Sequence, residues 1–234
     1  MFPIRMSLGM SIEASPWLRR FCVDHAVILG SSSQWRRKVL LSAGCRVVDA
    51  IDPNIDERAI RDSDPEKLVV SISHAKADAI LSKMNSSSVS SFTPETYLIC
   101  TDQVAVCEGK IREKPESESE AREFIRSYSE EGKPVNTCSG VVVVHAASGK
   151  RESGTYWNSI QYGRIPEAVV DEIVKGSVVY TCCGGFSVDC PIMGKWVESI
   201  EGSVDGVMGM PLALLEDLFR RHVSGRLPSI PFSL

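Results

Sequence analysis

The sequence lacks several features that would assign a chain to a class of protein at once. No apolar run approaches the roughly 20 residues that a membrane-spanning helix needs, so we expect no membrane partner. Positive charge is not in excess: the formal net charge of −4 argues against a general binder of nucleic acid or membrane surfaces. The eight cysteines include no C-x-x-C pair with a matching second pair, so a cysteine zinc site is not indicated. There is no internal repeat and no Walker A motif.

What is present is the composition of an ordinary globular protein, with 43% hydrophobic and 24% charged residues. A chain of 234 residues can bury on the order of 70% of its unfolded surface, so it needs no disulfides to be stable. We therefore interpret the cysteines as scattered buried thiols in a reducing compartment. The sequence leaves the oligomeric state open, with a homodimer among the options.

We predict a single domain over residues 25–224, with a flexible leader over 1–24 and a tail over 225–234. The first 21 residues hold three arginines, several serines and one acid, a composition similar to that of organelle transit peptides. A disordered leader on a cytoplasmic protein is the favoured interpretation, and organelle targeting is the alternative.

Strands and helices alternate along the predicted domain. Apolar runs predict strands at 25–30 and 45–51, and a strand at 96–111 that turns at Glu108-Gly109 into a short return strand. They also predict a hairpin at 136–163 that turns at Ser148-Gly149. Apolar periodicity and capping signals, among them Ser117 and Glu120 as a capping box, predict helices at 34–43, 65–84, 117–131, 166–175 and 209–222. Residues 85–95 form a serine-rich loop, and 177–190 a strand followed by a loop. The alternation predicts an α/β domain, with helices flanking a mixed twisted sheet.

Two arginines stand in the first turn of the helix predicted at 34–43, in the stretch "GSSSQWRRKVLL". Positive charge is unfavourable at a helix N-terminus, because the backbone dipole is already positive there. A bound phosphate would reverse the sign of that effect, and a strand, a Gly/Ser loop and a helix N-terminus together favour anions. We therefore predict phosphate contacts from Ser31, Ser33, Arg36 and Arg37, the alternative being that the arginines point into solvent.

Other charged residues also stand where apolar ones are expected. Lys76 lies in the middle of the apolar face of the 65–84 helix, where a lysine can also simply extend to solvent. Asp102 interrupts a run that otherwise predicts a buried strand. Lys114 precedes a proline, and Glu57 follows the second strand. Taken together, cations that neutralise phosphates and carboxylates that hold a metal are what polyphosphate hydrolysis requires.

The same residues carry a resemblance to a known family. The chain resembles the Maf proteins, which are nucleoside triphosphate pyrophosphatases, from Ala26 to His222. Four signatures match in order and spacing: "LGSSSQWRRKVLL", "ISHAKADAI", "TDQVAVCEGKIREKP" and "GMPLALL". The resemblance implies an α/β fold related to the inosine-triphosphate pyrophosphatases, with the active site in a cleft.

The resemblance also implies roles for individual residues. Asp102 would be the proton acceptor that activates water. Ser31, Arg36, Lys76 and Lys114 would engage the phosphates of a nucleoside triphosphate. A divalent cation, Mg²⁺ or Mn²⁺, would be held by Glu57 and Asp102.

Three positions point to the branch of the family that hydrolyses 7-methyl-GTP. Trp35 and Gln103 stand where that branch has them, and Asp189 falls where it usually has a glutamate. The physics agrees, because N7-methylguanine carries a positive charge that a Trp face attracts by about 0.5–2 kcal/mol. We predict hydrolysis of 7-methyl-GTP between its α- and β-phosphates. The alternatives are a dTTP/UTP pyrophosphatase of the same family and a non-catalytic nucleotide sensor that regulates cell division.

Overall fold

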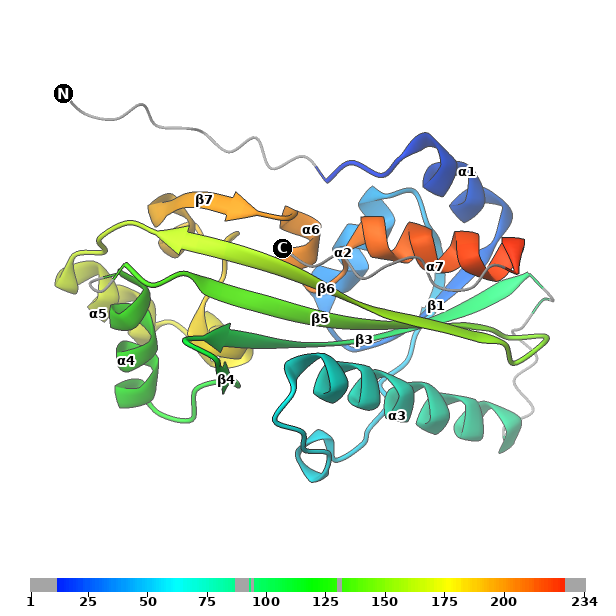
Figure 1. Ribbon diagram of the computed structural model, residues 1–234, viewed down its shortest axis with the longest axis horizontal. Coiled ribbons are helices and arrows are strands. Elements are labelled where there is room, and N and C mark those ends of the chain that lie inside the picture. Colours follow the sequence, from blue (N-terminus) through cyan, green and yellow to red (C-terminus); the bar gives the residue numbers. More distant parts are fainter. Residues whose placement is uncertain (1–11, 87–92, 94, 130–131, 226–234) are drawn as a thin grey trace.

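The computed structural model describes residues 12–86, 93, 95–129 and 132–225 (Figure 1). Its centre is a mixed seven-strand sheet of order β2-β1-β3-β5-β6-β7, with β4 paired to β3. Strands β2, β1 and β3 run parallel to their neighbours, and the pairs β3–β5, β5–β6 and β6–β7 are antiparallel. The strands are β1 (Ala26–Gly30), β2 (Arg46–Ala50), β3 (Thr96–Cys107), β4 (Lys110–Arg112), β5 (Val135–His145), β6 (Arg151–Tyr162) and β7 (Val197–Glu201).

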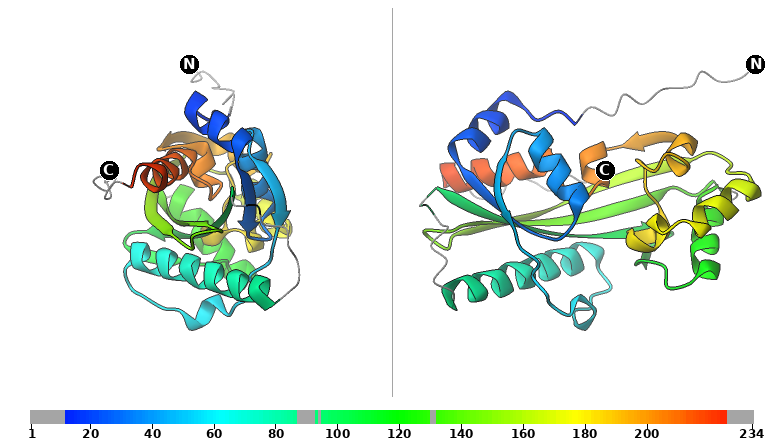
Figure 2. Two further views of the ribbon diagram at one scale, coloured as in Figure 1. Left: turned by 90° about the vertical axis from the view of Figure 1, so that its right-hand side faces the viewer. Right: turned by 180° about the vertical axis from the view of Figure 1, so that it is seen from behind.

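Helices cover both faces of this sheet, which confirms the predicted fold class. The helix α3 (Pro65–Ser86) packs along one face, and α1 (Pro16–Asp24), α2 (Gln34–Ser42) and α7 (Leu212–Ser224) lie on the other (Figures 1 and 2). The helices α4 (Glu118–Ser129) and α5 (Glu167–Lys175) pack together at the far end of the long strands. The short helix α6 (Val204–Val207) follows β7.

The core divides into layers because strand side chains alternate between the faces of a sheet. Leu29, Ile99 and Val143 point toward α1, α2 and α7. Their neighbours Ile28 and Val142 point toward α3. Buried apolar side chains on both faces explain why these strands read as continuous apolar runs rather than alternating ones.

A glycine lets α3 lie close against the sheet. A Cβ atom at Gly140 of β5 would stand 2.6 Å from the carbonyl carbon of Val69, a backbone atom of α3 that cannot move aside. The helix therefore approaches β5 through a position without a side chain, and its next turns present Lys76 toward the middle of the sheet.

The prediction of a leader is wrong for residues 16–24, which form α1. Ser15 caps this helix by accepting the N–H of Leu18, and Leu18 and Phe21 are buried in the core. The part of the prediction that falls on residues 1–11 lies outside the described residues. The helix was missed because its stability comes from burial of its apolar side against α7 and β1, which the local sequence does not reveal.

The interpretation of all cysteines as free thiols is also wrong for one pair. Cys22 of α1 and Cys45, which follows α2, are joined as a disulfide. Their proximity depends on the docking of α1. The other six cysteines are free, and Cys100, Cys107 and Cys138 among them are buried.

The segment 177–190 is not a strand followed by a loop. It forms two short 3₁₀ helices, η2 (Val178–Thr181) and η3 (Cys183–Gly185), and continues as turns. Gly184 and Gly185 have φ angles of +69° and +65°, in the left-handed region that favours glycine. These two residues end any extended conformation and fold the segment back toward β3.

The predicted serine-rich loop and the predicted tail fall mostly outside the described residues. Asn85 and Ser86 belong to α3, whereas most of the predicted serine-rich loop and residues 226–234 of the predicted tail lie outside the described residues.

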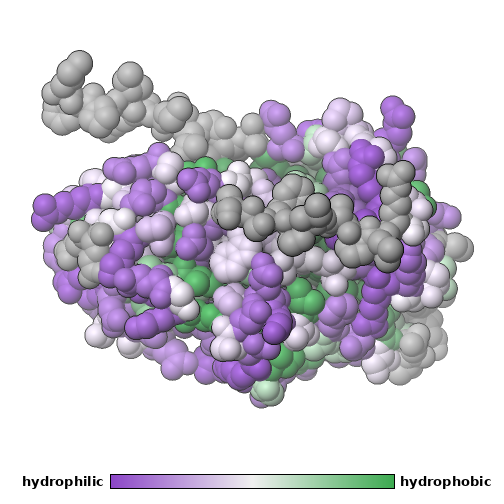
Figure 3. Space-filling view, in the orientation of Figure 1, coloured by the Kyte–Doolittle hydropathy of each residue, from purple (hydrophilic) through white to green (hydrophobic). Residues whose placement is uncertain are grey.

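Within the described part of the chain, none of the helices combines the length and the apolar character needed to cross a membrane. Figure 3 shows one face of the molecule, where hydrophilic side chains dominate and apolar ones appear between them.

Candidate functional site

A cavity of about 550 Å³ opens where the carboxyl ends of β1 and β2 meet α3 and β3. Its wall is built from segments far apart in the sequence: the loop after β1 with the start of α2, the loop after β2, α3, β3, residues 181–189 and the end of α6. The predicted site residues that line it are Ser31, Ser33, Trp35, Arg36, Glu57, Lys76, Asp102, Gln103, Lys114 and Asp189.

The loop between β1 and α2 presents donors to this cavity. Ser33 is the N-cap residue of α2, but its side chain makes no capping bond, and the first turn holds no acidic residue. The Oγ of Ser31 accepts the N–H of Ser33 and a guanidinium N–H of Arg36, both at 3.2 Å. Arg36 also donates to the carbonyl oxygen of Thr101 in β3, at 3.1 Å.

These contacts place Arg36 at the cavity wall, and Arg37 lies elsewhere. Arg36 reaches back over the loop to β3 instead of into solvent, so it is held at the cavity wall. Arg37 is exposed and is not among the residues that line the cavity. The predicted phosphate contact from Arg36 is compatible with this geometry, whereas the structure does not bring Arg37 to the site.

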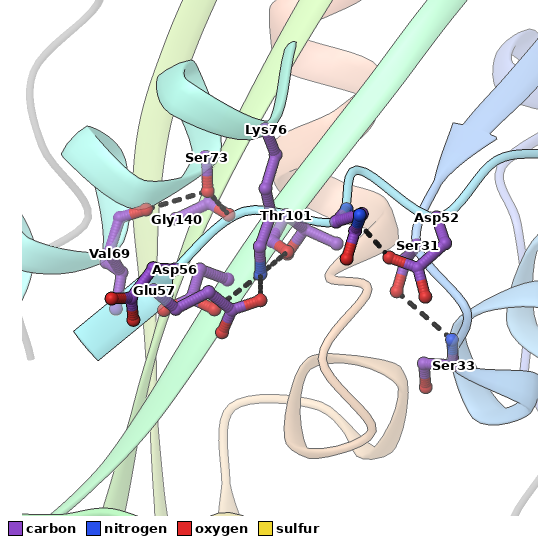
Figure 4. Close-up of polar contacts among 12 residues, drawn as sticks. Ser31, Ser33, Asp52, Asp56, Glu57, Val69, Ser73, Lys76, Thr101 and Gly140 are labelled. Carbon is purple, nitrogen blue, oxygen red and sulfur yellow. Dashed lines mark hydrogen bonds and ion pairs between the residues drawn. The ribbon is translucent and has the colours of Figure 1, made fainter. Parts of the chain in front are cut away.

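Lys76 places its ammonium group between the carboxylates of Asp102 and Glu57, of which Figure 4 labels Glu57. Its Nζ lies 2.8 Å from Oδ1 of Asp102 and 3.0 Å from Oε1 of Glu57, and it donates to the carbonyl oxygen of Thr101 at 3.4 Å. Lys76 is 4% exposed and Asp102 is 6% exposed. Each buried charge has the other as its partner, because an unpaired one would be costly. Lys76 therefore does not extend to solvent as a surface lysine does.

The two carboxylates around Lys76 are also the ligands predicted for a metal. Both approach one nitrogen atom, so Asp102 and Glu57 share the ammonium group of Lys76. In the described residues there is no group of three or more His, Cys, Asp or Glu side chains that could hold a metal ion. Two carboxylates suit magnesium, which usually takes one or two from the protein and the rest of its ligands from water and substrate phosphates.

The net charge of the cavity wall is slightly negative. The lining residues include three basic and four acidic side chains, a net charge of −1. Phosphates must therefore be bound by local donors, and an additional cation would favour them. The charged residues are Arg36, Lys76 and Lys114, and Asp52, Glu57, Asp102 and Asp189.

The residues predicted to select the base line the same cavity. Trp35 is partly exposed, with the Nζ of Lys38 at 5.7 Å from its ring centroid. The side-chain amide nitrogen of Gln103 donates to Oγ of Ser139 and to the carbonyl oxygen of Gly206, each at 2.9 Å. Asp189 accepts a hydrogen bond from Oγ of Ser187 at 2.5 Å.

Several lining residues were not predicted from the sequence. They come from the loop after β2 and from the segment that was expected to be a strand: Asp52, Thr181, Cys182, Cys183 and Phe186. Burial raises the pKa of the Cys183 thiol to about 12, and burial also raises the pKa of Cys182. Both stay protonated near neutral pH, so neither thiol is a nucleophile here. The adjacent cysteines and glycines at 182–185 were the one signal that could have drawn attention to this segment.

Comparison with known proteins matches this chain to one family. Residues 26–222 match the family described as Maf-like protein. A protein of Dictyostelium discoideum named 7-methyl-GTP pyrophosphatase is 40% identical over 192 residues, which cover 82% of this chain and 94% of that protein. A protein of Idiomarina loihiensis with the same name is 27% identical over 200 residues, covering 84% of this chain and 94% of that protein.

Proposed function

The chain belongs to the Maf family, and on that premise we propose that it hydrolyses 7-methyl-GTP to the monophosphate and pyrophosphate. The observation that carries this proposal is the buried Lys76–Asp102 pair at the wall of a cavity that Arg36 and Ser31 also line. An acid and cations in one cavity are what cleavage of a phosphoanhydride needs. The names of the relatives from Dictyostelium discoideum and Idiomarina loihiensis support the choice of nucleotide.

We assign the phosphates to the donors around the β1–α2 loop. Ser31 and Arg36 present a hydroxyl and a guanidinium group there, and the N-terminus of α2 lacks a side-chain cap. Lys114 is exposed at the rim of the cavity, from which it can reach the leaving pyrophosphate. Guanidinium and ammonium groups stabilise the negative charge that develops on phosphate oxygens in the transition state.

We assign the proton transfer to Asp102. Its Oδ1 accepts a hydrogen bond from Lys76, which leaves Oδ2 to take the proton from the attacking water. The hydrogen bond from Lys76 fixes the orientation of this carboxylate. Because both groups are almost fully buried, the pair is preorganised before the substrate binds.

A divalent cation fits this site, with Glu57 and Asp102 as the residues that would hold it. When bound, such a cation would polarise the phosphate oxygens and make a bound water more acidic. The net charge of −1 on the cavity wall supports a requirement for it, because a triphosphate adds several further negative charges.

We assign the base to the part of the cavity lined by Trp35, Gln103 and Asp189. The charged N7-methylguanine ring would lie on the Trp35 face. The carboxylate of Asp189 and the amide oxygen of Gln103 would accept hydrogen bonds from the N–H groups of the guanine edge.

A pyrophosphate-release assay tests the proposal. Purified protein is incubated with 7-methyl-GTP, GTP, UTP and dTTP, with Mg²⁺ or Mn²⁺ and with a chelator. We expect 7-methyl-GTP to have the highest kcat/KM, and no release with the chelator. A rank of UTP or dTTP equal to that of 7-methyl-GTP would contradict the assigned base, and nucleotide affinity without any release would favour a sensor.

The variant Asp102→Asn tests the assigned proton acceptor. Asparagine keeps the size of the side chain, and Lys76 retains Glu57 as a partner at 3.0 Å. We expect the variant to stay folded by circular dichroism and to lose pyrophosphate release. Hydrolysis at the wild-type rate would show that another group takes the proton.

A cytoplasmic location and a homodimer stay predictions from the sequence. Size-exclusion chromatography with light scattering measures the mass of the particle in solution and decides the second.

A further inference from the structure

The side-chain amide of Gln103 is held in one orientation by the protein. Its Nε2 donates one hydrogen to Oγ of Ser139 and the other to the carbonyl oxygen of Gly206, each at 2.9 Å. A carbonyl oxygen can only accept, so the amide nitrogen must face Gly206. Both N–H groups are thereby used, and the amide oxygen is on the opposite side.

The partner of the amide oxygen is weak. Oε1 lies 3.8 Å from Sγ of Cys183, and both residues line the cavity. A thiol is a poor donor, and burial keeps it protonated. An N–H group of a bound base would therefore be a better partner for this oxygen than the thiol.

The fold fixes both groups that hold the amide nitrogen. Gln103 of β3 and Ser139 of β5 are directly opposite each other in the antiparallel register, and Ser139 is 0% exposed. Gly206 lies in α6, where a Cβ atom would be 2.6 Å from Oδ1 of Asn158. Asn158 also accepts the N–H of Ser203, the N-cap residue of α6, at 2.9 Å. Asn158 of β6 thus ties the start of α6, the helix that carries the Gly206 carbonyl, to the sheet.

We propose that Ser139 is a positioning residue for base recognition, which acts by turning the Oε1 acceptor of Gln103 toward the base. This inference rests on the proposed function and deepens it. The site then requires a base with an N–H donor at this place, as guanine has in its N1–H and N2–H groups. A base with an acceptor at this place would bring a lone pair against Oε1. A site that is built to hydrogen-bond an N–H group strongly rejects a ligand that lacks this group.

The test uses Ser139→Ala and steady-state pyrophosphate release. Without the hydroxyl the amide has one anchor instead of two, so it can turn away from the base. We expect the KM for 7-methyl-GTP to rise about three- to tenfold, the range that corresponds to losing one neutral hydrogen bond. We expect kcat to stay within about twofold of wild type, because the phosphates are bound elsewhere. For the same reason the inhibition constant of inorganic tripolyphosphate should not change.

Two further variants separate positioning from a merely structural role. Ser127→Ala removes another buried serine hydroxyl, one that donates to the carbonyl oxygen of Phe124 in α4 and does not line the cavity. Its KM for 7-methyl-GTP should equal that of wild type. In a Gln103→Met background, Ser139→Ala should cause no further rise in KM, since the amide through which it acts is absent.

The outcomes distinguish this proposal from the proposed function. If the wild type hydrolyses 7-methyl-GTP but Ser139→Ala keeps the wild-type KM, the positioning role is overturned and the function stands. A rise in KM that persists in the Gln103→Met background overturns it in the same way. If UTP is the best substrate, the assigned base is wrong. Uracil also carries an N–H donor, at N3, so the KM for UTP in Ser139→Ala then decides the positioning role. If no triphosphate is hydrolysed, both proposals are overturned.

Discussion

Replacement of Lys76 by methionine isolates the cost of leaving a buried carboxylate without its partner. Methionine matches the length and apolar stem of lysine but carries no charge. Of the two carboxylates that contact Nζ, the side chain of Glu57 is 48% exposed and can be solvated, whereas that of Asp102 is 9% exposed and cannot. The destabilisation therefore comes mainly from Asp102. Breaking a buried pair by removing one partner costs about 3–5 kcal/mol, and we expect that loss in the free energy of unfolding.

A double-mutant cycle measured by urea unfolding near neutral pH checks this account. Lys76→Met/Asp102→Asn removes both charges, so it should be more stable than Lys76→Met alone by about 1.5 kcal/mol or more. Lys67→Met, on the same helix, removes an exposed lysine whose side chain is 71% accessible, and should change stability by less than about 0.5 kcal/mol. A loss below about 1 kcal/mol in Lys76→Met, or a double variant no more stable than the single one, would refute the reasoning.

Three other predictions follow from the same structure. Gly140→Ala forces a Cβ atom to 2.6 Å from the backbone of Val69, and the free energy of unfolding should fall by about 1–3 kcal/mol in urea titrations. Trp35→Ala should raise the KM for 7-methyl-GTP by about two- to thirtyfold and leave that for UTP unchanged, since only the charged base gains from the ring face. Burial, with the charges of His145 and Lys150, lowers the pKa of His222 below its usual 6.5. The folded state then binds fewer protons at His222 than the unfolded chain does. The contribution of the neutral imidazole to stability is therefore fully present above pH 6.5 and is lost as the pH falls below that value. Between about pH 7 and pH 5 the urea midpoint should fall less in His222→Gln than in wild type.

Elements with strong local signals could be predicted from the sequence. Ser117 accepts the N–H of Glu120 at 3.1 Å and so begins α4, as the capping box predicts. Glu108 and Gly109 have φ angles of +52° and +73° and turn β3 into β4 where the turn was expected. In each case the residues that determine the conformation are neighbours in the sequence.

Elements that depend on distant contacts could not be predicted in this way. The run Val178-Val179-Tyr180 has the residues of a strand, yet Val179 is buried beside α5 and the Tyr180 hydroxyl donates to the carbonyl oxygen of Val174. These contacts exist only once α5 has formed. The same holds for α1, whose buried side chains Leu18 and Phe21 pack in the core with residues of α7.

The site shows the same division between local and distant causes. Arg36, Lys76 and Asp102 each carry a charge where the local pattern demands none, and the structure brings all three to one cavity. Ser139 looks like any polar residue of a strand, because its partner Gln103 is 36 positions away and is set opposite it only by the β3–β5 register. A residue that reacts or binds charge disturbs its own segment and can be found there. A residue that only orients another one leaves no such mark, so its role becomes visible only when the sheet is assembled.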